Sequence, residues 1–384
     1  MRKSSLLLLV ITEGQFLYYS YMIIAHEDLR DTCLSSKDIV VSDSILSNLS
    51  AEKRAVVERR KATLDFLACR YIISTGSISA GFIIAPKQST KRKHPVIVYL
   101  RGGTGDFGIV NAGTMYLQLA ALAELGYLVI GTQYTGNALG TGTDTWGGED
   151  LEATMYVQRI IQSLPRVDAQ AVTMIGGSRG ATMMYMALKG GFQARAAISI
   201  AGVSDLAKWV VSRPDMREIF CEMFGTSIDE ELAARSAVNW VEELPKSVRY
   251  ILIHGAEDET VPARQSQELH KRMDRAGLHV DLRIVSGKDH HITVDSQEIV
   301  DIISRSNLID MTNNVEDLLE FHPDFLEKVS LDDRELLAKF FFAGREVDVE
   351  DVAKYQADLE SSDPGVTERA RQAYARLMSA AGSS

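Results

Sequence analysis

A pentapeptide with glycine, serine and glycine at alternate positions is the first candidate for chemistry in this chain. It reads Gly176-Gly177-Ser178-Arg179-Gly180, follows an apolar run that ends at Ile175, and precedes the amphipathic stretch 181–189. A serine on a sharp turn between a strand and a helix can act as a nucleophile, and flanking glycines remove side chains that would collide there. An ordinary glycine-rich turn is the alternative interpretation.

An acid and a base follow this serine in the order that such a nucleophile requires. A serine hydroxyl attacks a carbonyl only when a base takes its proton, and the base needs an acid to orient it. Asp258 comes shortly after the apolar run 250–253, and His290 shortly after the run 281–285. Both residues are therefore expected beyond the carboxyl ends of strands, where the sites of open α/β sheets gather. The predicted catalytic triad is Ser178, Asp258 and His290.

Neighbouring residues leave alternatives open. Glu257 or Glu259 is the alternative acid, and His291 is the alternative base. His254 also ends a strand but precedes the acid, so we expect it to pack or to orient the loop. No two histidines and a carboxylate have the spacing of metal ligands on a helix, so the sequence predicts neither a metal nor a cofactor.

Acyl transfer also needs fixed N–H groups where negative charge develops on the carbonyl oxygen. The residue after the nucleophile supplies one of them, here the backbone N–H of Arg179, and a loop after an early strand supplies the second. The segment Arg101-Gly102-Gly103-Thr104-Gly105 fits that place. We assign the N–H of Gly103 to the predicted oxyanion hole, with Gly102 as the alternative. A phosphate-binding loop is the competing idea, but neither of its glycine motifs follows.

The elements that must position these residues alternate between short apolar runs and helical stretches. Such runs are typical of strands covered on both faces, and the alternation predicts a doubly wound, mostly parallel sheet. A polar segment with a helix capped by Ser50 precedes an antiparallel pair of strands, and the stretch 206–247 predicts a helical insertion. We expect an N-terminal segment over 1–64, a catalytic domain over 65–305 and an acidic helical extension over 306–384. The predicted strands lie at 67–73, 80–85, 95–100, 128–131, 171–175, 196–200, 250–253 and 281–285.

The charge and cysteine content exclude several classes of protein. The formal net charge is −11 among 384 residues, which argues against a general grip on nucleic acid. From Asp310 onward there are 17 acidic and 8 basic residues. This acidity indicates a solvated helical surface, with a docking surface for a basic partner as the alternative.

The location of the protein is predicted from its cysteines and its N-terminal residues. Three widely spaced cysteines indicate reduced thiols and a cytoplasmic protein. The apolar run from Leu6 to Ile11 is too short to cross a membrane before Glu13. Export and an N-terminal membrane anchor are the alternatives.

Several of these segments together resemble the catalytic domain of the prolyl oligopeptidase family of serine peptidases. They are Arg101-Gly102-Gly103, Gly136 through Trp146-Gly147-Gly148-x-Asp150, Gly176–Gly180, His254-Gly255-x-x-Asp258-x-x-Val261-Pro262 and Gly287-x-x-His290. The resemblance covers about residues 65–305 and implies an α/β-hydrolase fold. It also marks departures, because Thr135 stands where members often have arginine and Arg179 where they often have an aromatic residue. The 64 residues before the domain are too few for the β-propeller of longer members.

The sequence therefore predicts a serine hydrolase that acts through an acyl-enzyme, with small peptides as the substrate class that the resemblance implies. A carboxylesterase or other acyl hydrolase is the first alternative, and a non-catalytic binding module with the hydrolase fold is the second. Apolar positions at helical spacing after residue 310 predict internal packing or a homo-oligomer formed through the C-terminal helices.

Overall fold

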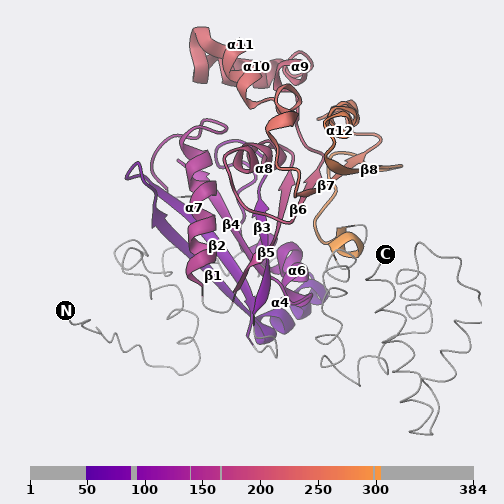
Figure 1. Ribbon diagram of the computed structural model, residues 1–384. Coiled ribbons are helices and arrows are strands. Elements are labelled where there is room, and N and C mark those ends of the chain that lie inside the picture. Colours follow the sequence, from indigo (N-terminus) through magenta and orange to yellow (C-terminus); the bar gives the residue numbers. More distant parts are fainter. Residues whose placement is uncertain (1–48, 88–92, 139, 165–166, 297–298, 304–384) are drawn as a thin grey trace, which may run out of the picture. The chain divides into compact units, whose positions relative to one another are not determined.

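The computed structural model describes residues 49–87, 93–138, 140–164, 167–296 and 299–303 (Figure 1). The chain divides into two compact units, Met1–Val300 and Asp301–Ser384. Nearly all of the second unit lies outside the described residues. The same holds for the predicted C-terminal helices and for the apolar run near the N-terminus, so those expectations stay predictions.

An eight-stranded sheet organises the first unit, in the spatial order β1-β2-β4-β3-β5-β6-β7-β8. The first three neighbours pair antiparallel, and β4 and the strands that follow it in this order all pair parallel. Strand–helix alternation gives this mostly parallel sheet, as predicted, and the α/β-hydrolase fold is confirmed. The strands are β1 (Leu64–Ile72), β2 (Ile78–Pro86), β3 (His94–Leu100), β4 (Leu128–Thr135), β5 (Val167–Gly177), β6 (Ala196–Ile200), β7 (Arg249–Gly255) and β8 (His279–Val285).

Helices cover the sheet (Figure 1). Ser50 caps the first described helix, since its hydroxyl accepts the N–H of Lys53, as its position before the run predicted. Residues 112–124 form two short α-helices that a π-helical turn joins. The described helical elements are α4 (Ala51–Thr63), α5 (Ala112–Thr114), η2 (Met115–Leu119), α6 (Ala120–Glu124), α7 (Glu149–Ser163), α8 (Arg179–Lys189), α9 (Leu206–Trp209), α10 (Pro214–Phe224), η3 (Gly225–Ser227), α11 (Ile228–Arg235), η4 (Ala237–Asn239), η5 (Val241–Glu243) and α12 (Arg264–Arg275).

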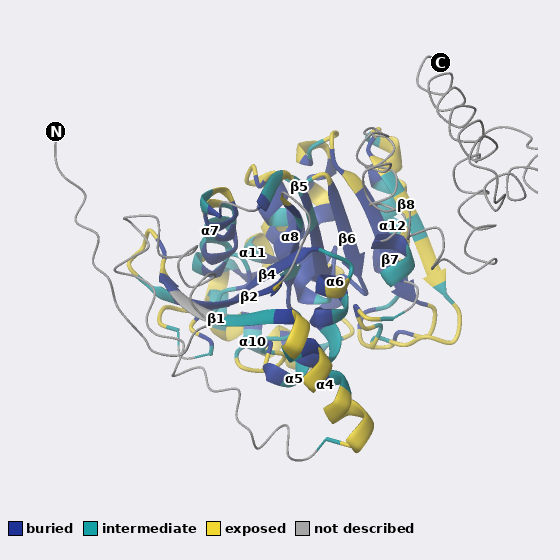
Figure 2. Ribbon diagram, turned by 90° about the horizontal axis from the view of Figure 1, so that it is seen from below, coloured by how far each residue is buried: buried dark blue, intermediate teal, exposed yellow. Residues whose placement is uncertain are grey.

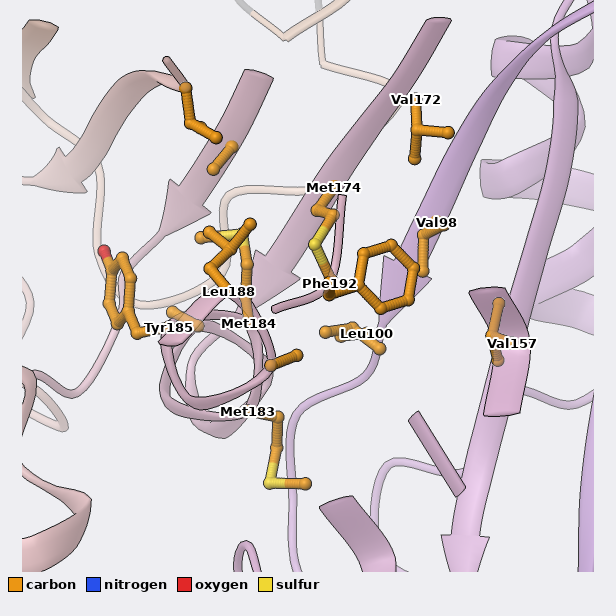
Figure 3. Close-up of a cluster of buried hydrophobic side chains, with 14 of the residues drawn as sticks. Val98, Leu100, Val157, Val172, Met174, Met183, Met184, Tyr185, Leu188 and Phe192 are labelled. Carbon is orange, nitrogen blue, oxygen red and sulfur yellow. The ribbon is translucent and has the colours of Figure 1, made fainter. Parts of the chain in front are cut away.

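The main core lies between the sheet and helices α7, α8 and α12. Alternate residues of β3, namely Val96, Val98 and Leu100, point into it, because successive side chains of a strand face opposite sides. Figure 3 shows Val98 and Leu100 beside Met174 of β5 and side chains of α8. The central strands are buried along most of their length, whereas α4 presents an exposed face (Figure 2). This packing fixes β5 and α8 against each other, and the turn between them carries Ser178.

The segment 206–247 is a helical insertion between β6 and β7, as the sequence predicted. It holds the short elements from α9 to η5 and forms a second apolar cluster with Trp146 and Val261. Phe220 meets the Trp146 ring edge-on, with ring centroids 5.1 Å apart. The insertion is therefore packed against the loops that follow β4 and β7, and the second of these loops carries Asp258.

Candidate active site

Ser178 occupies the turn between β5 and α8 in a strained backbone conformation. Its φ is 52° and its ψ is −119°, a region that a residue with a side chain rarely adopts. A Cβ on Gly176 would lie 2.4 Å from the carbonyl oxygen of Gly180, and one on Gly180 would lie 2.0 Å from that of Leu100. Only glycine fits at these two positions, which is why the strand can turn so sharply and leave the hydroxyl at the end of the sheet.

The structure brings Ser178, Asp258 and His290 into one hydrogen-bonded row. Asp258 Oδ2 lies 2.8 Å from His290 Nδ1, and His290 Nε2 lies 3.1 Å from Ser178 Oγ. A carboxylate only accepts, so Nδ1 carries the proton and Nε2 is left to accept from the serine hydroxyl. The three residues follow β5, β7 and β8, whose carboxyl ends meet at one edge of the sheet.

Asp258 is held as a carboxylate by four donors. The backbone N–H groups of Thr260 and Val261 donate to Oδ1 at 2.9 and 2.8 Å, while His254 and His290 donate to Oδ2. Burial by itself raises the pKa of Asp258, but the hydrogen bonds from His254, His290 and Val261 outweigh it and hold the pKa well below its usual value. The acid therefore stays charged and orients His290.

His254 contacts the acid directly, a contact that the sequence analysis missed. The ring is buried, with Nε2 at 3.1 Å from Asp258 Oδ2 and 2.7 Å from the carbonyl oxygen of Val261. Because both of these partners accept, Nε2 carries the proton, and Nδ1 accepts from Ser266 Oγ at 2.7 Å. The sequence analysis expected His254 only to pack or to orient the loop. Its position four residues before Asp258 was the one feature of the sequence that could have indicated this contact.

The alternative acids and the alternative base lie apart from this row. Glu257 and Glu259 are exposed, on either side of the buried Asp258. His291 is exposed too, and its ring centroid lies 6.0 Å from that of His290. In the described part of the chain, only His290 among these candidates hydrogen-bonds to Ser178.

The loop after β3 lies against the nucleophile. A Cβ on Gly102 would lie 3.2 Å from Ser178 Cβ, so the backbone approaches closely only because glycine stands there. The Arg101 guanidinium is buried and donates to the carbonyl oxygens of Gly102, Gly105 and Phe107 at 2.9–3.0 Å. In a trans peptide the C=O and N–H point opposite ways, so the N–H of Gly103 faces away from Arg101.

The second predicted donor, the backbone N–H of Arg179, begins α8. The first N–H groups of a helix have no acceptor within the helix and lie at its positive end, which suits a developing negative charge. The Arg179 side chain is fully buried and does not face the solvent. The sequence analysis did not predict its contacts with Gly103, Asp144 and Asp150.

Two classes of site are absent from the described residues. Over these ranges no group of three or more histidine, cysteine or carboxylate side chains could hold a metal ion. None of the helices described is both long and apolar enough to cross a membrane. Cys221, the one cysteine whose side chain is described, is a free and exposed thiol.

The part of the chain that holds this site is similar to known peptidases. The model of the prolyl oligopeptidase family matches residues 114–306, about half of the chain. The uncharacterized peptidase YtmA of Bacillus subtilis is 28% identical over 223 residues, which cover 57% of this chain and 84% of that protein. A probable dipeptidyl-aminopeptidase B of Phaeosphaeria nodorum is 24% identical over 54% of this chain, but the match spans only 23% of its own length.

Solved structures share the fold. The acylaminoacyl peptidase of Pyrococcus horikoshii superposes with a TM-score of 0.54 at 20% identity, covering 68% of this chain and 43% of the other. A puromycin-hydrolyzing peptidase of Mycobacterium tuberculosis gives a TM-score of 0.53 at 19% identity, covering 63% and 38%. Each similarity therefore concerns less than half of the solved chain.

Proposed function

Because this chain belongs to the prolyl oligopeptidase family, we propose that it is a serine peptidase that cleaves small peptides through an acyl-enzyme on Ser178. The observation that carries the proposal is the bridging position of His290, within 3.1 Å of the serine hydroxyl and 2.8 Å of the acid. A base in contact with both a nucleophile and an orienting carboxylate is the arrangement that acyl transfer requires.

The first half of the reaction forms the acyl-enzyme. Ser178 Oγ attacks the carbonyl carbon of the substrate while His290 Nε2 takes the hydroxyl proton. The charge that develops on the carbonyl oxygen is met by the N–H groups of Gly103 and Arg179. Asp258 stabilises the imidazolium that forms. The C–N bond then breaks, and His290 returns its proton to the leaving amine.

The second half releases the acyl group. Water takes the place of the amine, His290 removes one of its protons, and the resulting hydroxide attacks the ester carbon of acylated Ser178. The same two N–H groups meet the second oxyanion. Breaking of the ester C–O bond returns the proton to Ser178 Oγ and frees the carboxylic acid product.

The substrate class is taken from the relatives. Their names include dipeptidyl-aminopeptidase, acylaminoacyl peptidase and puromycin-hydrolyzing peptidase, all of which indicate short peptides or peptide-like amides. The exposed Phe107 of the oxyanion loop offers an apolar surface beside the site for such a substrate. We propose a cytoplasmic enzyme, on the cysteine usage that indicates reduced thiols.

A fluorophosphonate probe tests the nucleophile. We expect the folded wild type to be labelled on Ser178 and the Ser178→Ala variant to stay unlabelled, with equal melting temperatures for both. Labelling of Ser178→Ala at the wild-type rate would place the reactive serine elsewhere. A folded wild type that takes no label would instead favour the binding module.

A substrate panel tests the reaction class. Aminoacyl and dipeptidyl p-nitroanilides are compared with p-nitrophenyl esters of short acids, each with wild type and Ser178→Ala. Turnover of anilides that depends on Ser178 supports a peptidase. Turnover confined to the esters would identify an esterase and overturn the proposed substrate class.

A further inference from the structure

The side chain of Arg179 has no part in the mechanism above, yet it is buried directly behind the nucleophile. Nη1 donates to the carbonyl oxygen of Gly103 at 3.0 Å and to Asp144 Oδ2 at 2.7 Å. Nη2 donates to Asp150 Oδ2 at 2.7 Å and to Asp144 Oδ1. A guanidinium that is wholly removed from water has to be compensated by charge, and here two carboxylates supply it.

Arg179 and Asp144 both favour their charged forms although burial opposes charge on each. Burial opposes the charge on Arg179, but the hydrogen bond that it donates to Asp144 and the charges of Asp150 and Asp144 outweigh burial and raise the pKa of the guanidinium. Burial likewise disfavours the Asp144 carboxylate, yet the hydrogen bond and charge of Arg179 prevail and lower its pKa. The planar guanidinium of Arg179 therefore stays charged, and its hydrogen bonds to the carboxylates of Asp144 and Asp150 fix its orientation.

This fork is tied to the oxyanion loop at three successive residues. Arg179 holds the carbonyl oxygen of Gly103, and Asp144 Oδ2 accepts the N–H of Gly105 at 3.0 Å. Between them, Trp146 Nε1 donates to Thr104 Oγ1 at 3.0 Å. The loop that carries the second oxyanion donor is thus attached to the residue that carries the first.

Backbone strain concentrates around the same guanidinium. Tyr134, Trp146 and Ser178 have φ values of 67°, 52° and 52°, three of the five positive values among described residues other than glycine. The guanidinium lies 4.5 Å from the Tyr134 ring centroid and 4.9 Å from that of Trp146. Residues in such conformations persist only where their surroundings determine them tightly, and they gather at functional sites.

We propose that the Arg179 side chain is a positioning residue. It holds Gly103 by its carbonyl oxygen, next to the peptide N–H that Arg101 orients through Gly102, so that this N–H stays in register with the backbone N–H of Arg179. One residue then supplies one oxyanion donor and helps to position the other. The proposal rests on the serine peptidase function proposed above. Since the guanidinium is behind the loop and not in contact with substrate, its contribution appears only where negative charge develops on the carbonyl oxygen.

The test is Arg179→Lys, which keeps the charge but loses the fork. Using the best anilide from the panel, we expect kcat to fall by about 10- to 100-fold while KM changes less than about threefold, as for a misplaced oxyanion donor. A peptide aldehyde of the same sequence, which forms a tetrahedral adduct with Ser178, should lose affinity by the same factor as kcat/KM. The affinity for the matching carboxylic acid product should stay within about twofold.

Arg235→Lys is the matched control. Arg235 is also buried and also binds this region, since its Nε donates to the carbonyl oxygen of Trp146 at 2.7 Å, but it does not contact Gly103. We expect its kcat to stay within about threefold of wild type at a comparable change in melting temperature. Equal losses of kcat in both variants would reduce Arg179 to general support of the loops and overturn the proposal.

Asp144→Asn is a second variant that tests the same proposal if Arg179→Lys does not fold. It removes one charge but leaves Arg179 paired with Asp150 and Gly103, so a smaller loss of kcat, about 3- to 10-fold, is expected. Wild-type kcat and aldehyde affinity in a folded Arg179→Lys or Asp144→Asn enzyme would overturn the inference. Failure of the proposed function looks different, because wild type and Ser178→Ala would then behave alike toward fluorophosphonate.

Discussion

The two sides of the candidate active site are held by different means. On the oxyanion side, two buried arginines bind loop carbonyls and carboxylates, and the strained residues Tyr134 and Trp146 stack on one of them. On the acid–base side, the acid is fixed by backbone N–H groups and a buried histidine. The base His290 lies in an exposed loop, where residues 286–289 are all exposed.

This difference matches what each side must do. An oxyanion hole has to be rigid, because N–H donors that are already oriented need no reorganisation when negative charge develops on the carbonyl oxygen. The base has to take and return a proton in both halves of the reaction, and a single hydrogen bond to Asp258 is enough to orient its ring. The oxyanion side is therefore held by buried arginines, whereas the acid–base side pairs a fixed carboxylate with a half-buried imidazole.

Removing the base should have the largest effect. We expect His290→Ala to lower kcat/KM for the best anilide by about 10⁴-fold, since the hydroxyl of Ser178 then has no proton acceptor. The adjacent, exposed His291→Ala should stay within about twofold of wild type. If His291→Ala were the inactive variant, the base would be misassigned.

Distorting the oxyanion loop should rank second. Gly103 has a φ of +78°, and a Cβ there would lie 2.1 Å from the carbonyl oxygen of Phe107. Gly103→Ala should therefore lower kcat by about 10²-fold, within the range for loss of an oxyanion donor. Gly177→Ala is the matched control, because a Cβ at Gly177 has no heavy atom within 4 Å and its φ is not positive. Unchanged kcat in a folded Gly103→Ala enzyme would speak against this loop as the oxyanion hole.

Weakening the support of the acid should have a smaller effect. His254→Ala removes one donor to Asp258 and leaves the Val261 carbonyl without it, so we expect kcat to fall by about tenfold together with a lower melting temperature. His279→Ala, at an exposed position at the start of β8, serves as control and should change neither quantity. A loss of kcat below about twofold would reduce His254 to packing alone.

The smallest effect concerns acid stability. The pKa of Asp258 is lower in the folded protein than its unfolded value of about 3.9. The folded state then binds fewer protons, so this stabilising contribution is complete above the unfolded pKa and is lost as the pH falls through the folded one. Urea unfolding between pH 7 and 2 should show a steeper decline below about pH 4 for wild type than for Asp258→Asn. The exposed Asp274→Asn should follow wild type, and identical curves for wild type and Asp258→Asn would contradict the linkage.

The acid–base side of the site could be predicted from the sequence to a large extent. The order of strands and helices, the glycines around Ser178 and the positions of Asp258 and His290 after strands all depend on local patterns. Each pattern names a position at a strand end, and parallel strands bring those ends to one edge. For this reason the row of three side chains was predictable without coordinates, although its catalytic role stays a proposal.

The buried charges were not readable in this way. Nothing local distinguishes the side chain of Arg179 from a solvated arginine, because its partners lie about 30 residues earlier. Asp144 is in the loop after β4, and Asp150 is in the first turn of α7. Likewise, the spacing of His254 and Asp258 does not show that the rings of His254 and His290 both hydrogen-bond to the same oxygen of Asp258, Oδ2. Local patterns along the chain specify which strands and helices form and which reactive side chains follow them. Which charges are buried together depends on the folded structure, because desolvation and pairing depend on everything packed around a group.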